Sequence, residues 1–216
     1  MPYKSYAKAP TTKLGELLAN SITHGVGVGL SITGLVILIV RAVRRGTGWH
    51  LAGFLVFGIS LIALYLASTL YHAMADKPWK AVLQWLDHSA IFILIAGTYT
   101  PYLLIVLRGW MGWTLFGLMW GLALVMLVLK LSLKQRFEKP PTWLYLLAGW
   151  LGVVVFWQGM GGLSPTSLLL LVLGGAAYSL GVIFYKWRSL PYSHAVWHLF
   201  VLGGSMLHFF SVLLLV

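Results

Sequence analysis

The chain has 216 residues, of which 60% are hydrophobic and only 9% are charged. Because a soluble domain carries about 25% charged residues, this composition excludes an ordinary soluble protein and predicts an integral membrane protein. The net charge of +11 would suggest nucleic acid as the partner of a soluble chain. Here the Lys and Arg residues lie between hydrophobic segments, so we expect membrane lipids with anionic head groups as partners and no nucleic acid. The absence of cysteine excludes disulfides and thiolate chemistry.

Seven stretches are long and apolar enough to cross a membrane as helices, which takes about 20 residues each. They cover roughly residues 19–40, 49–72, 82–107, 110–130, 142–160, 164–186 and 192–216. The predicted fold class is therefore all-α: a polytopic membrane protein with a seven-transmembrane helix bundle. The connections are too short to form another domain. We expect one domain over residues 1–216, with residues 1–18 as a cytoplasmic N-terminal segment.

The Lys and Arg residues near the segment ends predict the orientation, because they gather on the cytoplasmic side. With the N-terminus inside, the inner side holds eleven: Lys4, Lys8, Lys13, Lys77, Lys80, Lys130, Lys134, Arg136, Lys139, Lys186 and Arg188. The outer side holds four: Arg41, Arg44, Arg45 and Arg108. We therefore expect a multi-pass protein of the inner (plasma) membrane, with the N-terminus cytoplasmic and the C-terminus outside.

Several polar residues within the apolar segments are expected at one depth. His72 ends the second segment, Asp87 lies near the start of the third, and His194 and His198 open the seventh. Alternating helices bring all of these positions near the inner face, together with Glu16, Asn20 and His24 at the start of the first segment. Polar side chains are costly inside a membrane, so their gathering at one level indicates a functional site.

The histidines in this group are suited to a metal. His194 and His198 are four residues apart and share one face of a helix. With His72 they can supply three of the four tetrahedral positions of a catalytic zinc, leaving the last for water, which zinc activates at neutral pH. Asp87 would hold that water and take its proton. Ser68 precedes His72 by one turn, so it could hydrogen-bond the water or a substrate carbonyl.

Other interpretations of the same residues remain open. His194 and His198 can be two interfacial histidines, and Asp87 can be a helix N-terminal charge favoured by the macrodipole. A proton relay or an ion path is a further alternative.

Three other histidines are not expected in the site. His24 lies near the same level, but we interpret it as a helix–helix hydrogen-bond partner. His88 points about 100° away from Asp87 on a helix. His208 lies about 15 Å beyond His198 along the helix, which is too far to join the cluster.

Longer motifs around these residues resemble one known family. Glu16-Leu-Leu-Ala-Asn20-Ser-Ile-Thr-His24 resembles the N-terminal signature of the bacterial haemolysin III family. Ser68-Thr-Leu-Tyr-His72, the stretch from Asp87 to Pro101, and His194-Ala-Val-Trp-His198 resemble its remaining motifs. The family belongs with the progestin and adiponectin receptors and, more distantly, the alkaline ceramidases.

The resemblance implies seven transmembrane helices, an internal N-terminus and a zinc held near the cytoplasmic side. By the family pattern His72, His194 and His198 would be the ligands, with Asp87 and Ser68 around the metal-bound water. We therefore expect a zinc-dependent hydrolase that acts on a lipid amide or ester near the cytoplasmic leaflet. Two alternatives stay open: a membrane sensor or receptor with a structural zinc, and a cytolytic pore-forming protein.

Overall fold

The computed structural model describes residues 14–74, 77–133, 140–156 and 162–216. Over these ranges the chain forms seven α-helices and one π-helical turn, and it forms no strand. The elements are α1 (Leu14–Arg45), α2 (Gly48–Ala73), α3 (Lys80–Pro101), η1 (Tyr102–Val106), α4 (Gly109–Leu133), α5 (Thr142–Phe156), α6 (Pro165–Lys186) and α7 (Ser193–Leu213). This confirms the all-α bundle predicted from the apolar segments.

Each predicted segment corresponds to one helix, with two differences in detail. The first helix begins at Leu14, ahead of the expected residue 19. The third segment changes to a π-helix directly after Pro101, over Tyr102–Val106. Six helices are long and apolar enough to cross a membrane, and α5 is shorter over its described residues. Residues 1–13 of the expected N-terminal segment, residues 134–139 and residues 157–161 lie outside the described ranges.

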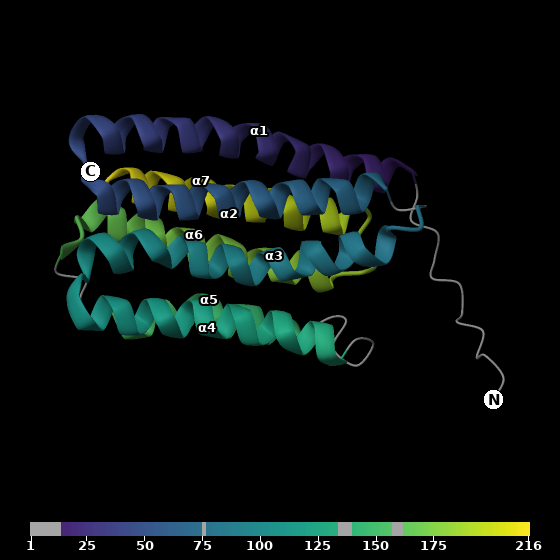
Figure 1. Ribbon diagram of the computed structural model, residues 1–216. Coiled ribbons are helices and arrows are strands. Elements are labelled where there is room, and N and C mark those ends of the chain that lie inside the picture. Colours follow the sequence, from purple (N-terminus) through teal and green to yellow (C-terminus); the bar gives the residue numbers. More distant parts are fainter. Residues whose placement is uncertain (1–13, 75–76, 134–139, 157–161) are drawn as a thin grey trace.

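The helices lie side by side along a common direction, with α1 at one edge and α4 and α5 at the other (Figure 1). α2 packs against both α1 and α3, and α7 packs against α6 and α1. Because successive helices alternate in direction, the start of α1 and the C-terminus lie at opposite ends of the bundle (Figure 1). The ends of α2 and α6 and the starts of α1, α3 and α7 therefore share one end, which we call the site end.

Apolar side chains cover the outside of the bundle as well as its core. Large exposed side chains include Ile22, Ile37, Leu118, Leu124 and Ile183. In water such a surface would be costly, whereas in a bilayer the lipid tails cover it. The helices α2 and α3 are the most enclosed. Both contribute polar side chains to the interior at the site end.

Candidate metal centre

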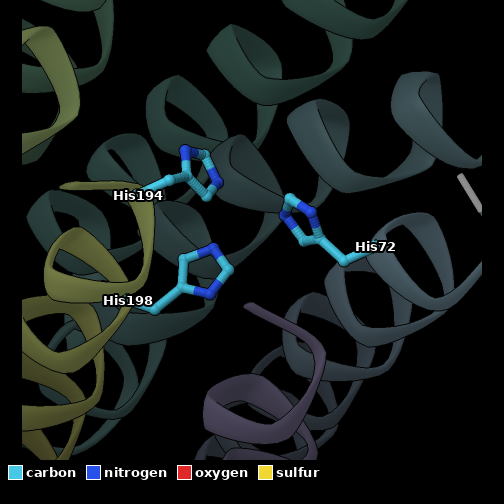
Figure 2. Close-up of side chains that lie close together, drawn as sticks. All are labelled: His72, His194 and His198. Atoms are coloured by element: carbon cyan, nitrogen blue, oxygen red, sulfur yellow. The ribbon is translucent and has the colours of Figure 1, made fainter. Parts of the chain in front are cut away.

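Three histidines from two distant parts of the chain meet at the site end. His72 comes from the last turn of α2, and His194 and His198 come from the first turns of α7. One ligand atom from each lies within 4.8 Å of the other two. Figure 2 shows the three rings around a common space, each with a nitrogen turned toward it. We call these three residues the histidine cluster.

The rings of the histidine cluster are inclined to one another rather than stacked. The ring centroid of His72 lies 4.9 Å from that of His194, with an angle of 59° between the two ring planes. It lies 5.1 Å from the ring centroid of His198, with an interplanar angle of 67°. His194 and His198 are 4.6 Å apart at 68°. Rings inclined in this way can direct one nitrogen each toward a single point, as the ligands of a tetrahedral ion must.

Helix α1 determines which nitrogen of His198 faces the cluster. Nδ1 lies 3.1 Å from the carbonyl oxygen of Asn20 and 3.1 Å from the hydroxyl of Thr23. A carbonyl oxygen only accepts, so Nδ1 carries the proton and donates it. The lone pair is then on Nε2, which is the form in which an imidazole binds a metal, with its other nitrogen held by a backbone carbonyl.

The fit to a metal ion can be tested on His72. Its Nε2 is buried and has no hydrogen-bond partner among the described residues. A buried nitrogen without a partner costs free energy, and a bound cation removes that cost. Three imidazoles are a donor set that suits the borderline transition metals. The histidine cluster can therefore hold a metal ion.

The turn before α7 positions the histidine pair. Tyr192 adopts the left-handed conformation, with φ of 57°, at the residue where the helix begins. Its backbone N–H points to the Glu16 carboxylate at 3.4 Å, a long contact. Its hydroxyl would lie 2.8 Å from a Cβ at position 15, so the absence of a side chain at Gly15 allows the two elements to approach. The start of α7 is thus joined to the start of α1.

Asp87 and Ser68 lie beside the histidine cluster. Both side chains are buried, and the Ser68 hydroxyl hydrogen-bonds the Asp87 carboxylate. With His194 and His198 they line one cavity of about 170 Å³, which we call the main cavity. Its remaining wall is largely apolar and comes from α1, α2, α3, α5, α6 and α7. The five residues predicted for the site therefore come together at one end of the bundle.

The structure corrects the sequence-based interpretation of His24. We expected it to hydrogen-bond a neighbouring helix, but both ring nitrogens are buried without a partner among the described residues. Its ring stacks on His198, with centroids 3.5 Å apart and an interplanar angle of 16°, and the edge of Tyr65 packs against it. His24 also lines the main cavity. The sequence did indicate that His24 could lie near the site: Asn20 and His24 are four residues apart, which puts both on one helix face.

His88 lies outside the histidine cluster, as its angle to Asp87 predicted. It does line the main cavity. Its carbonyl oxygen lies 3.4 Å from the hydroxyl of Tyr145. His208 likewise lines the main cavity and does not belong to the histidine cluster, as its distance along α7 predicted.

The fold and site define a class: a multi-pass helical protein of the plasma membrane, with a histidine cluster that opens into an apolar cavity at one end of the bundle. A family model described as "Haemolysin-III related" matches residues 14–209. The chain belongs to the haemolysin III family.

Its relatives match along almost their full length. The chain is 48% identical over 198 residues to "Hemolysin-3 homolog" of Bacillus subtilis (strain 168), covering 92% of this chain and 93% of that protein. It is 48% identical over 198 residues to "Hemolysin-3" of Bacillus cereus, covering 92% and 90%. It is also 26% identical over 210 residues to "Monocyte to macrophage differentiation factor" of Homo sapiens, covering 91% and 83%.

Proposed function

We propose that this protein is a zinc-dependent hydrolase that cleaves a lipid amide or ester at the cytoplasmic leaflet. One observation carries the proposal: His194 and His198 of the histidine cluster line, together with Ser68 and Asp87, a cavity whose wall is otherwise largely apolar. An apolar cavity with a few polar groups at one end suits a molecule with a hydrocarbon chain and a single reactive polar group.

Each residue has a role that follows from its chemistry. His72, His194 and His198 would hold the zinc, which supplies Lewis-acid chemistry that activates water at neutral pH. Asp87 takes the proton of the attacking water as general base. Ser68 donates its hydrogen bond to Asp87 and holds the carboxylate in place. The apolar wall binds the acyl chain and excludes bulk water from the reacting carbonyl.

The decisive experiment measures fatty-acid release together with metal content. Purified protein is incubated with ceramide-like and phospholipid substrates in detergent or bilayers, and zinc is measured beside each assay. Asp87→Asn should retain the zinc, because the amide preserves size and the ligands are imidazoles. Its rate should fall by about 10²- to 10⁴-fold, the usual cost of losing a general base. Ser68→Ala should cost less, since it removes one hydrogen bond.

Other outcomes favour other functions. Zinc-loaded wild-type protein that releases no fatty acid from a broad lipid panel would favour a membrane sensor with a structural metal. The Bacillus cereus relative is named for haemolysis. Leakage of dye from liposomes on addition of the protein, unchanged by loss of a histidine, would favour a cytolytic function.

A further inference from the structure

One buried cation in the bundle has no role in the proposed reaction. Lys130 lies in the last turn of α4, at the site end, and is only 3% exposed. Among the described residues it is the one Lys or Arg that is buried. A lysine near the end of a membrane helix ordinarily extends to the head groups, where water and phosphates surround its charge. Lys130 is instead enclosed by protein, so its charge must be compensated there.

Helix α3 provides two direct contacts to the Lys130 ammonium. Nζ lies 3.2 Å from the carbonyl oxygen of Trp85, to which it donates, and 6.0 Å from the centroid of the Trp85 ring. Both contacts are attractive, the first as a hydrogen bond and the second as a cation–π contact. Both groups are uncharged, however, so neither neutralises the ammonium. A cation in an apolar interior still requires an anion nearby.

The one buried acid among the described residues lies on the same helix, two residues beyond Trp85. Asp87 is 9% exposed, and its Cα is about 3 Å further along the axis of α3. Attraction between the Lys130 ammonium and the Asp87 carboxylate acts between the packed helices α3 and α4. Glu16, the other acidic residue that the structure describes, is at the start of α1 and only partly buried. The buried cation and the buried anion therefore lie on neighbouring helices at the same end of the bundle.

We propose that Lys130 is the counter-ion of Asp87 and a positioning residue for it. Its charge holds Asp87 as an ionised carboxylate in the apolar interior, and its bond to the Trp85 carbonyl fixes the turn of α3 that carries Asp87. A carboxylate buried without a cation is costly and tends to take up a proton. Lys130 does not line the main cavity, so it acts on the site through Asp87.

The pairing deepens the proposed function, and only its consequence for the reaction rests on that function. A general base must be ionised before it can accept a proton. Ser68 donates to the Asp87 carboxylate from α2, and Lys130 attracts it from α4. Asp87 is thus held from two sides, and neither partner takes up the space in which a substrate would bind.

The alternative role for Lys130 is that of an anchor, which joins α4 to α3 through Trp85 and is indifferent to Asp87. The two roles differ in a measurable way. An anchor contributes the same stability whether residue 87 is charged or neutral, whereas a counter-ion depends on the charge. Removing one member of a buried ion pair is strongly destabilising, while replacing both members costs little.

The test is a double-mutant cycle on the thermal stability of the purified full-length protein, in one detergent at neutral pH. Lys130→Met keeps the length of the side chain and removes its charge, and Asp87→Asn keeps the size and removes the charge. Each single variant should lower Tm by about 10 °C. The double variant should lose less than either single variant. Zinc content is measured for all of them, so that a change in metal loading is not taken for a change in pairing.

Lys186→Met is the matched control, because Lys186 is also in the last turn of a helix at the site end but is exposed. It should leave Tm near that of the wild type, alone and in combination with Asp87→Asn. Lys130→Arg keeps the positive charge and should retain more stability than Lys130→Met. If Lys130→Met alone gives no folded protein, recovery of folded protein in the double variant is the expected result.

Losses that add up in the double variant overturn the proposal and leave Lys130 as an anchor. A Lys130→Met variant as stable as the wild type overturns it as well, as does a double variant that does not fold. Where fatty-acid release is found, Lys130→Met should lower kcat by less than Asp87→Asn does, leave KM unchanged and be rescued by Lys130→Arg. An unchanged kcat would contradict the positioning role. An absence of hydrolysis would contradict the proposed function and leave the pairing standing, whereas additive losses would contradict the pairing alone.

Discussion

At the scale of single residues, His198 is held from two sides by α1. The backbone of Asn20 and the hydroxyl of Thr23 accept from Nδ1, and the ring of His24 covers the imidazole face. A ligand fixed in both tautomer and ring plane loses little freedom when it binds a metal. The start of α1 is therefore part of the site although it supplies no member of the histidine cluster.

The three members of the histidine cluster should each be needed for metal binding. We expect about one zinc per chain, and His72→Ala, His194→Ala or His198→Ala should each lower the zinc content strongly, because one of three ligands is lost. Metal analysis of protein purified without added metal gives the measurement. His50→Ala and His208→Ala should leave the content near that of the wild type. Equal loss in His208→Ala and His198→Ala would contradict this assignment.

Two variants of His24 distinguish packing of its ring on His198 from direct binding of the metal. His24→Ala removes the ring that packs on His198 and should weaken zinc affinity by about fivefold, since a stacked pair contributes about 1 kcal/mol. His24→Phe keeps a flat ring and should retain most of the affinity. Zinc titration against a competing chelator measures both. Should His24→Phe lose as much affinity as His24→Ala, a ring nitrogen of His24 must contact the metal.

At the scale of helices, close packing between α2 and α3 away from the site helps to fix the positions of the site residues. Gly53 of α2 faces Pro101 of α3, and a Cβ at residue 53 would lie 2.9 Å from the Pro101 Cα. Small residues at such crossings allow membrane helices to approach closely. The same two helices carry His72 and Asp87 at the site end.

Widening that crossing should lower stability. Gly53→Ala should cost about 1–3 kcal/mol through overpacking, which lowers Tm by several degrees for a chain of this size. Gly117→Ala on α4 is the matched control, because nothing lies within 4 Å of its added Cβ. That substitution should leave Tm unchanged or raise it slightly, since alanine favours a helix over glycine. Thermal unfolding in one detergent compares the two, and an equal Tm for both variants would contradict the packing argument.

At the scale of the whole molecule, the orientation in the membrane decides which leaflet the site faces. The eleven Lys and Arg residues assigned to the inner side predict that the site end is cytoplasmic. Reporter fusions after Lys13 and Lys134 should report the cytoplasm, and a fusion after Val216 should report the outside. A reporter after Lys134 that signals from the outside would reverse the assignment and move the site to the outer leaflet.

The sequence alone was enough to predict the membrane class, the seven helices and the histidine cluster. Segment length against bilayer thickness locates the helices, and alternation of direction brings His72, His194 and His198 to one depth. The depth of a residue in the membrane follows from its position along a helix, and that position can be counted in the sequence. The same reasoning placed Asp87 and Ser68 beside the cluster.

Only the tertiary structure decided which faces of the helices meet. A membrane helix is apolar toward the lipid and apolar toward its neighbours, so the pattern of hydrophobic residues does not reveal how it is rotated about its axis. For that reason the sequence did not predict that His24 stacks on His198 or that His88 lies in the cavity wall. The hydrogen bond of His208 to Leu171 and its contact with Gly174 could not be predicted either, because both partners belong to another helix. Helix rotation is set by side-chain packing between helices, and that is decided in three dimensions.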